Sequence, residues 1–461
     1  MQENIGMESF VKQLLYNHNF GANEYTRDLK SVEEYGCLLE GVQEFFDVNK
    51  SLSREALYEH IYDMSGIRGK IDKFIMEKQS APGLVLTVGT LKHQKIVTVG
   101  NQQEINDDGK LELVQMREDS IFDLSSVTKL FTCVVVLKLV DEGFFDLNNM
   151  VGELDDRFVY LNEVSVEDLM TFRVPLKTDA RIDDAKSLGD AERLIFEIKP
   201  ETTQTRLYTD MGAIVLSYVI EKITGKTLYD LVKAYILDPC KMKDTNLVID
   251  YESLGRTVSN NFERRINDAQ YIVIDDIKKG MVNDSKARQL ESWNRKLYGH
   301  AGLFSTARDM GKFARTLISG KILNTKWLDM IGLNQTGRSL PDGGYSQFHG
   351  YMCYSKNPVA SDSEVNHLLS GNAFALGGYT GNQLTIDWRN QIYVFMASNR
   401  CHNRVTRVIG DSAKLDEHGR VIWNNGQSYV YSRRYAYDRD DSVINPAVEL
   451  AILYRFVEEL K

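Results

Sequence analysis

Ser126 and Lys129 are the residues of this 461-residue chain whose types and spacing could support nucleophilic catalysis. They stand three positions apart, at the start of an apolar run that continues from Leu130 to Val140. If a helix begins here, both side chains lie on one face and near its positive end. A serine hydroxyl needs a base, and burial, a helix pole and neighbouring cations all lower the pKa of a lysine. The pair therefore predicts a self-activating serine nucleophile.

A second copy of the same spacing lies near the N-terminus, at Ser9 and Lys12. No long apolar run follows it, and short motifs recur by chance in a chain of this length. We interpret this copy as incidental. The case for Ser126 must therefore come from the rest of the chain.

The composition is that of an ordinary globular protein, with 43% hydrophobic and 26% charged residues. A formal net charge of −10 disfavours nucleic acid and anionic membrane surfaces as general partners. The five cysteines are scattered, without a C-x-x-C pair or a histidine cluster at ligand spacing, which favours reduced, mostly buried thiols. We expect neither a metal nor an organic cofactor.

The N-terminal residues and the lengths of the apolar runs bear on location. Met1 is followed by polar residues, without the basic and apolar regions of a signal peptide. No apolar run approaches the ~18 residues that a membrane span needs. These features predict a cytoplasmic protein without a membrane span, although a chain from which an export signal had been removed would look the same.

The chain is long for a single core, so one large domain with insertions, or two subdomains, is expected. Residues 1–66 are polar with helical periodicity, which predicts a helical N-terminal extension that packs on the main domain or mediates dimerisation. Residues 67–461 would form the main domain. A mostly helical subdomain, approximately residues 145–370, would be inserted into it.

Two predicted hairpins flank the helical middle of the chain. Runs at 84–88 and 95–99 are rich in β-branched residues and are separated by a polar turn. Runs at 383–387 and 391–396 flank a second turn. Strands from both ends can meet in one antiparallel sheet with helices on its faces, which gives an α/β fold of the α+β type.

Other stretches have weaker patterns. Residues 250–300 are polar and irregular, and we expect them to include loop. Residues 403–440 are charged and rich in tyrosine, which favours a surface excursion. Apolar residues from Val448 to Val457 recur at helical spacing and predict a last amphipathic helix.

From about residue 67 to its end, the chain resembles the serine β-lactamases and penicillin-binding proteins. The likeness is to the class C-like branch, which also holds esterases and D-amino-acid peptidases. Ser-x-x-Lys is the nucleophile motif of this family. The other landmarks are weak singly but specific in their order and spacing. They are Ala81-Pro82-Gly83, Phe122-Asp123-Leu124-Ser125, Asp141-Glu142-Gly143, Tyr208-Thr209-Asp210, Pro239-Cys240-Lys241-Met242, Gly299-His300-Ala301-Gly302-Leu303-Phe304-Ser305-Thr306 and Gly378-Tyr379-Thr380-Gly381.

The resemblance implies a second catalytic motif, Tyr-x-Asn. Tyr208 and Asp210 lie where the family has it, 82 residues after the nucleophile and directly before an apolar stretch. Tyr160 and Asn162 fit the letters better but follow Ser126 by only 34 residues. We therefore assign the motif to Tyr208.

The resemblance also implies a proton path. A tyrosine held near the ammonium of Lys129 has its phenolate favoured, and can take the serine proton and pass it to the leaving group. Asp210 replaces the usual asparagine, and a carboxylate there would raise the pKa of Lys129 and shift the role of base towards Tyr208. Asp210 could also, or only, cap the following helix.

The third element of the family is a Lys-Thr-Gly or His-Thr-Gly triplet on an edge strand. Leu376, Gly377 and Gly378 are the aligned residues, and the small ones would let a substrate backbone approach. Leu376 replaces the family's cation, so we expect poor recognition of a substrate carboxylate and a preference for neutral esters or amides. The N–H groups of Ser126 and Tyr379 would form the oxyanion hole.

His300 lies in a segment that recurs in this branch. Either a structural turn or a wall of the acyl pocket fits it, and both interpretations remain open. Asp284 is a weaker candidate of the same kind.

The sequence thus predicts a serine hydrolase that works through a Ser126 acyl-enzyme on a small ester, amide or β-lactam, with an esterase-like preference. One alternative is a true β-lactamase, a D-alanyl carboxypeptidase or a D-amino-acid peptidase. Another is a non-catalytic binding or sensor protein on the same fold. The sequence leaves the natural substrate and the oligomeric state open.

Overall fold

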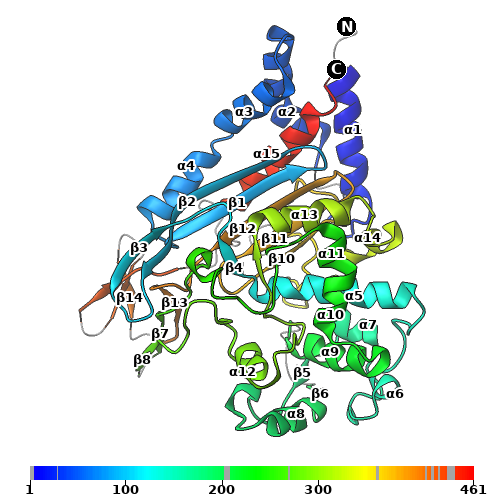
Figure 1. Cartoon of the computed structure of the whole chain (residues 1–461). Coiled ribbons are helices and arrows are strands. Elements are labelled where there is room, and N and C mark those ends of the chain that lie inside the picture. Colours follow the sequence, from blue (N-terminus) through cyan, green and yellow to red (C-terminus); the bar gives the residue numbers. More distant parts are fainter. Residues whose placement is uncertain are drawn as a thin grey trace.

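The chain folds around a six-stranded antiparallel sheet to which both its N-terminal and C-terminal parts contribute (Figure 1). The predicted fold class is confirmed, because helices cover both faces of this sheet. The computed structural model describes residues 5–27, 30–201, 208–267, 270–359, 363–410, 413–416, 420–423, 426–432 and 442–460. In spatial order the strands are β10 (Phe374–Gly377), β11 (Gln383–Asp387), β12 (Ile392–Ser398), β1 (Gly83–Thr90), β2 (Gln94–Ile105) and β3 (Leu111–Gln115).

Both predicted hairpins are confirmed by strand pairing. β1 pairs with β2, with Leu84 opposite Val99, and β11 pairs with β12, with Asp387 opposite Ile392. The two hairpins join where β1 pairs antiparallel with β12, and Leu84 lies opposite Ser398 there. The first and last strands of the catalytic region thus meet at the centre of one sheet.

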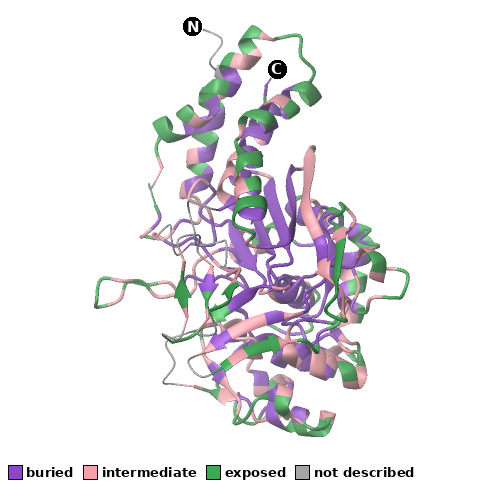
Figure 2. Ribbon diagram, turned by 90° about the vertical axis from the view of Figure 1, so that its left-hand side faces the viewer, coloured by how far each residue is buried: buried purple, intermediate pink, exposed green. Residues whose placement is uncertain are grey.

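β1 is buried along its whole length because its side chains alternate between two cores. Leu84 and Leu86 point into a core that contains the C-terminal helix α15 (Ile444–Val457), which confirms the predicted last helix. Val85 points into the other core, with α5 (Thr128–Asp141) and α13 (Ala307–Ile318). In Figure 2 the central strands of the sheet are buried, whereas β2 is of intermediate burial along most of its length and β3 is mostly exposed.

The N-terminal residues form helices, as their periodicity indicates. Rings of Phe10 in the first helix and Phe456 in α15 lie 5.3 Å apart, and this segment shares its core with the sheet. That residues 1–66 form a separate extension stays a prediction. The helices are α1 (Ile5–Asn19), α2 (Val32–Val48), α3 (Arg54–Met64) and α4 (Ile67–Asp72), followed by a π-helical turn at Lys73–Glu77.

The middle of the chain supplies most of the remaining helices. That it forms an inserted subdomain over approximately 145–370 stays a prediction. Its helices are α6 (Val151–Leu154), α7 (Val166–Met170), α8 (Leu188–Phe196), α9 (Met211–Thr224), α10 (Leu228–Val232), α11 (Asp238–Cys240), α12 (Ser285–Asn294) and α14 (Thr325–Ile331). Its short strands are β4 (Ile121–Asp123), β5 (Leu176–Lys177), β6 (Lys199–Pro200), β7 (Glu263–Asn267), β8 (Gln270–Ile274) and β9 (Phe304–Thr306).

The stretch 250–300 is more ordered than expected, since it contains the β7–β8 hairpin and α12. β7 carries glutamate and two arginines in its first three residues, so it lacks the apolar alternation that predicts a strand. It pairs in parallel with β13 (Val405–Val408), which belongs to the expected surface excursion. Parts of that excursion, 411–412, 417–419, 424–425 and 433–441, lie outside the described residues. Its other strands are β14 (Lys414–Leu415), β15 (Val421–Ile422) and β16 (Ser428–Tyr429).

Within the described ranges, no helix is both long and apolar enough to cross a membrane. The same ranges contain no group of three or more histidine, cysteine, aspartate or glutamate side chains placed to hold a metal ion. All five cysteines are free thiols, and all except Cys37 are buried.

Candidate active site

Ser126 lies in a single turn of 3-10 helix, Ser125–Val127, between β4 and α5. Ser125 has a φ of +49°, which a residue with a side chain rarely adopts. Its N–H donates to Asp123 Oδ1 across 2.8 Å, and this contact holds the turn in place. α5 then ends at Asp141, two residues before Gly143 with its φ of +77°.

Asp123 joins three segments around the nucleophile turn. Its Oδ2 accepts the N–H of Asn283 across 2.7 Å, and its carbonyl accepts the hydroxyl of Thr380 across 2.8 Å. The Asn382 amide donates to the same carbonyl across 2.6 Å. Burial raises the pKa of Asp123 to about 6. The side chain of Asp123 thus holds the α12 region, and its backbone carbonyl holds the β10–β11 turn, beside Ser126.

Lys129, on the first turn of α5, reaches Ser126 from within the core. Its Nζ lies 3.1 Å from Ser126 Oγ, 2.7 Å from Asp210 Oδ1 and 3.0 Å from the carbonyl oxygen of His300. The side chain is fully buried. Burial alone would lower the pKa of Lys129, but Asp210 and Tyr208 raise it. Lys129 is therefore an ammonium that donates to its neighbours, Ser126 among them.

Tyr208 lies over Lys129, with its ring centroid 5.0 Å from Nζ. Its ring stacks parallel to that of Tyr354 at 5.8 Å, and both tyrosines line the cavity next to Ser126. Tyr160, in contrast, is 54% exposed, and its ring lies 6.0 Å from the ammonium of Lys199. The geometry thus favours Tyr208 over Tyr160, while its role as the base stays a prediction.

Asp210 stands at the N-cap position of α9, but its side chain makes no capping hydrogen bond. Its two oxygens instead reach two ammonium groups, Lys129 at 2.7 Å and Lys286 at 3.1 Å. Burial alone would raise the pKa of Asp210, but these two lysines hold it below its ordinary value. Asp210 is thus a carboxylate shared between two cations.

The N–H group assigned to the oxyanion hole lies next to the nucleophile turn. Tyr379 N–H donates to the hydroxyl of Ser125 across 3.1 Å. Gly378 lets the two segments meet, because a Cβ there would lie 2.7 Å from the carbonyl oxygen of Leu124. The small residue thus serves the approach of the nucleophile turn, whereas its expected contact with substrate stays a prediction.

Leu376 and Gly377 are buried in β10. The side chain of Leu376 is fully buried in the core that contains α5, and it does not line the cavity. The structure therefore does not support the expected direct contact of Leu376 with substrate. Its apolar side chain packs beneath the site.

His300 is also fully buried and does not line the cavity. Its Nε2 lies 3.0 Å from Asp284 Oδ1, and its carbonyl accepts the ammonium of Lys129. Asp284 does line the cavity and caps α12 by accepting the N–H of Ala287. His300 thus holds Lys129 through its backbone carbonyl, which favours the structural interpretation over a wall of the acyl pocket.

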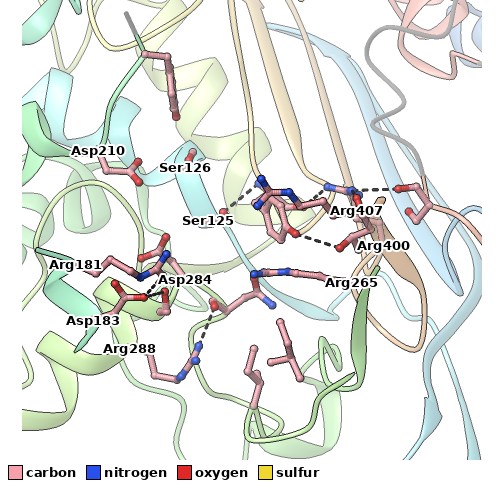
Figure 3. Close-up of a pocket in the computed structure, with 18 of the residues that line it drawn as sticks. Ser125, Ser126, Arg181, Asp183, Asp210, Arg265, Asp284, Arg288, Arg400 and Arg407 are labelled. Atoms are coloured by element: carbon pink, nitrogen blue, oxygen red, sulfur yellow. Dashed lines mark hydrogen bonds and ion pairs between the residues drawn. The ribbon is translucent and has the colours of Figure 1, made fainter. Parts of the chain in front are cut away.

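Ser126 opens into a cavity of 790 Å³ whose lining is rich in arginine (Figure 3). Five arginines line it, and Figure 3 shows Arg181 and Arg288 apart from Arg265, Arg400 and Arg407. The five are Arg181, Arg265, Arg288, Arg400 and Arg407.

The arginines of the cavity differ in their partners. Arg400 donates to carbonyl oxygens, at 2.8 Å to Tyr379 and 3.1 Å to Ser432. The exposed Arg407 has no carboxylate partner among the residues that the structure describes. The other three are paired with carboxylates, Arg181 with Asp183, Arg265 with Glu263 and Arg288 with Asp276.

The charges that line the cavity do not cancel. Its described lining contains the five arginines but only three carboxylates, those of Asp183, Asp210 and Asp284. The cavity therefore carries an excess of positive charge.

Arg400 lies just after the last predicted strand, which places it within reach of the site, but the other four arginines were missed by sequence reasoning. They come from separated segments, and none belongs to a motif. Lys286 was missed as well, because its stretch was expected to include loop. The sequence Asn283-Asp284-Ser285-Lys286 does carry a signal, since an aspartate directly before a helical run is a capping pattern.

The chain is similar to several known proteins. The family model described as Beta-lactamase matches residues 71–417. A putative D-alanyl-D-alanine carboxypeptidase of Salmonella typhimurium is 24% identical over 325 residues, which cover 63% of this chain and 72% of that protein. A teichoic acid D-alanine hydrolase of Staphylococcus aureus is 21% identical over 387 residues, or 83% and 86% of the two chains. A class C β-lactamase structure from Rhodobacter sphaeroides superposes with a TM-score of 0.52 at 16% identity and covers 72% of this chain and 93% of its own.

Proposed function

The chain belongs to the β-lactamase family, and from that premise we propose that it is a serine hydrolase that forms an acyl-enzyme at Ser126. The observation that carries the proposal is the distance of 3.1 Å between Ser126 Oγ and Lys129 Nζ, at the wall of a cavity large enough for a small substrate. The names of both relatives describe hydrolytic enzymes, which supports the same reaction class.

In the proposed reaction, Ser126 Oγ attacks the carbonyl carbon of the substrate. Tyr208 accepts the serine proton and passes it to the leaving group as the ester or amide bond breaks. Since Asp210 keeps Lys129 charged, the lysine acts by stabilising the phenolate of Tyr208. The N–H groups of Ser126 and Tyr379 hold the oxyanion, and water then releases the acyl group.

We further propose that the substrate carries an anionic group. The expected preference for neutral esters rested on the missing cation at Leu376, but five arginines line the cavity from other segments. Guanidinium groups bind carboxylate and phosphate in bidentate geometry. Since the names of both relatives refer to D-alanine, a D-alanyl ester or amide with a nearby anion is the first class to test.

A matched pair of peptides tests this proposal. Diacetyl-L-lysyl-D-alanyl-D-alanine carries a terminal carboxylate, and its C-terminal amide differs only in that charge. We expect faster acylation of Ser126 by the acid, measured as kcat/KM and as an adduct in intact-mass spectrometry. p-Nitrophenyl acetate and a chromogenic cephalosporin complete the panel.

Each alternative has its own result in this panel. Fast hydrolysis of p-nitrophenyl acetate, with equal and slow turnover of the two peptides, would favour an esterase that prefers neutral substrates. Fast turnover of the cephalosporin alone would favour a true β-lactamase. No adduct with any of the four would favour a binding or sensor protein.

A further inference from the structure

The ammonium of Lys129 belongs to a closed ring of polar contacts. Lys129 contacts Asp210 at 2.7 Å, Asp210 contacts Lys286 at 3.1 Å, and Lys286 contacts Asp284 at 3.3 Å. Asp284 contacts the ring Nε2 of His300 at 3.0 Å, and the His300 carbonyl returns to Lys129 at 3.0 Å. Two ammonium groups and two carboxylates therefore alternate beside Ser126.

We infer that Lys286 is a positioning residue for the acylation of Ser126, and that it allows Asp210 to stand where the family motif implied by the resemblance has a neutral asparagine. This inference rests on the proposed function. Lys286 does not line the cavity, and its side chain is 19% exposed. It can therefore reach the reaction only through Asp210 and Asp284.

The net charge of the cluster depends on both Asp210 and Lys286. With asparagine at position 210 and no lysine at 286, Lys129 and Asp284 would leave the cluster neutral when His300 is neutral. Asp210 alone would add a negative charge beside the serine, where the oxyanion forms, and would oppose it. Lys286 restores neutrality, because it occupies Asp210 Oδ2 while Lys129 occupies Oδ1. The Asp210–Lys286 pair is thus an electrostatic equivalent of one asparagine.

The charge of Lys286 is maintained by its surroundings. Burial alone would lower its pKa, but Asp210 and Asp284 on either side raise it. Lys286 therefore stays protonated over the range in which the enzyme would be assayed. The titratable groups near Asp210 are Lys129, Lys286, Asp284, His300 and Tyr208. A neutral residue in place of Lys286 would change the net charge of this set of groups.

Four variants test the inference on the full-length protein. Lys286→Met removes the charge and keeps much of the length, while Lys286→Arg keeps the charge. Asp210→Asn and the double variant Asp210→Asn/Lys286→Met complete a cycle. The readouts are the rate of Ser126 acylation by p-nitrophenyl acetate, a neutral probe, and the pH at which this rate is half-maximal.

We expect Lys286→Met to slow acylation about tenfold or more, which is within the range of coupling energies between groups in contact. The pH at which its rate is half-maximal should rise, because the negative charge of Asp210, no longer balanced by Lys286, opposes the loss of a proton beside Ser126. Lys286→Arg should retain most of the rate. The double variant should be faster than Lys286→Met, and its pH profile should return towards that of the wild type.

Two results would overturn the inference while leaving the proposed function intact. One is an active Lys286→Met variant with an unchanged pH profile. The other is a double variant whose loss equals the product of the two single losses. A wild-type protein that gives no adduct with p-nitrophenyl acetate or with the peptide pair would instead overturn the proposed function, and the inference with it.

Discussion

Tyr379 donates its backbone N–H to the hydroxyl oxygen of Ser125 across 3.1 Å, one residue before the predicted nucleophile. The donor assigned to the oxyanion hole is therefore already directed at the nucleophile turn. A substrate carbonyl oxygen would compete with the Ser125 hydroxyl for it. The strained φ of Ser125 and its anchor on Asp123 fix that hydroxyl in place.

The choice of Tyr208 as the base gives the first prediction. Tyr208→Phe should slow acylation on the order of 10²-fold or more, the scale of a lost general base. Its melting temperature should scarcely change, since the ring keeps its contacts with Tyr354 and Phe172. The matched control is Tyr160→Phe on the exposed surface. If that control is the more damaging change, the wrong tyrosine has been assigned.

The arginine-lined cavity gives the second prediction. Arg407→Gln should lower kcat/KM for the peptide with a free carboxylate by about one order of magnitude, since a charged hydrogen bond contributes roughly 1.5–3 kcal/mol. The amidated peptide should be unaffected. Arg193→Gln, an exposed arginine on α8, is the control for a general change of charge. Equal losses with both peptides would argue against an anion site at Arg407.

The burial of Leu376 gives the third prediction. A lysine there would supply the family's cation, but Leu376 is fully buried in the core beneath the site. Leu376→Lys should therefore strongly lower the melting temperature, because it buries an unpaired charge. Leu376→Met, which conserves volume, should cost less than about 1.5 kcal/mol. A stable Leu376→Lys protein that acylates penicillins faster than the wild type would contradict this account.

The contact between α1 and the catalytic region gives the fourth prediction. Burial lowers the pKa of Lys356 to about 7, and its Nζ lies 3.2 Å from His18 Nδ1 on α1. The unfolded chain, with a lysine pKa of about 10.4, binds more protons than the folded one between these two values. Stability should therefore rise with pH from about 7 to 10, with a slope of up to roughly 1.4 kcal/mol per pH unit from this group.

Urea denaturation at several pH values measures this slope. Lys356→Met removes the titrating group, so its curve should be flatter than that of the wild type over the same range. The control is Lys12→Met, which removes an exposed lysine of α1 and should keep the wild-type slope. Identical slopes for the wild type and Lys356→Met would show that Lys356 is charged in the folded state.

Sequence patterns predicted the parts of the fold that rest on periodicity. The β1–β2 and β11–β12 hairpins were found because β-branched runs alternate with turns, and α5 because an apolar run follows Ser126. The β7–β8 hairpin was missed because one of its strands carries charge next to a polar cavity. An alternating apolar pattern indicates a strand with one buried face. A strand that lines a charged site does not have this pattern.

The residues of the candidate site also fall into two groups, those that local motifs predict and those that only the fold brings together. Ser126, Lys129, Tyr208 and Asp210 could be found because each lies in a short motif at the start of a helix. The cavity arginines and Lys286 come from segments far apart in the chain, and only the fold brings them together. Leu376 could be aligned with the family from its neighbours, but its burial depends on packing against α5, which no local pattern reports.

The assignment of Ser126 as the nucleophile is the central claim. Intact-mass spectrometry after exposure to the peptide with a free carboxylate or to p-nitrophenyl acetate tests this claim directly. A protease digest then locates the adduct. The wild type should gain one acyl group on the proteolytic fragment that contains Ser126. Ser126→Ala should gain none, and Ser9→Ala, in the second copy of the motif, should behave as the wild type. An adduct that persists in Ser126→Ala, or that maps to another residue, would contradict the account.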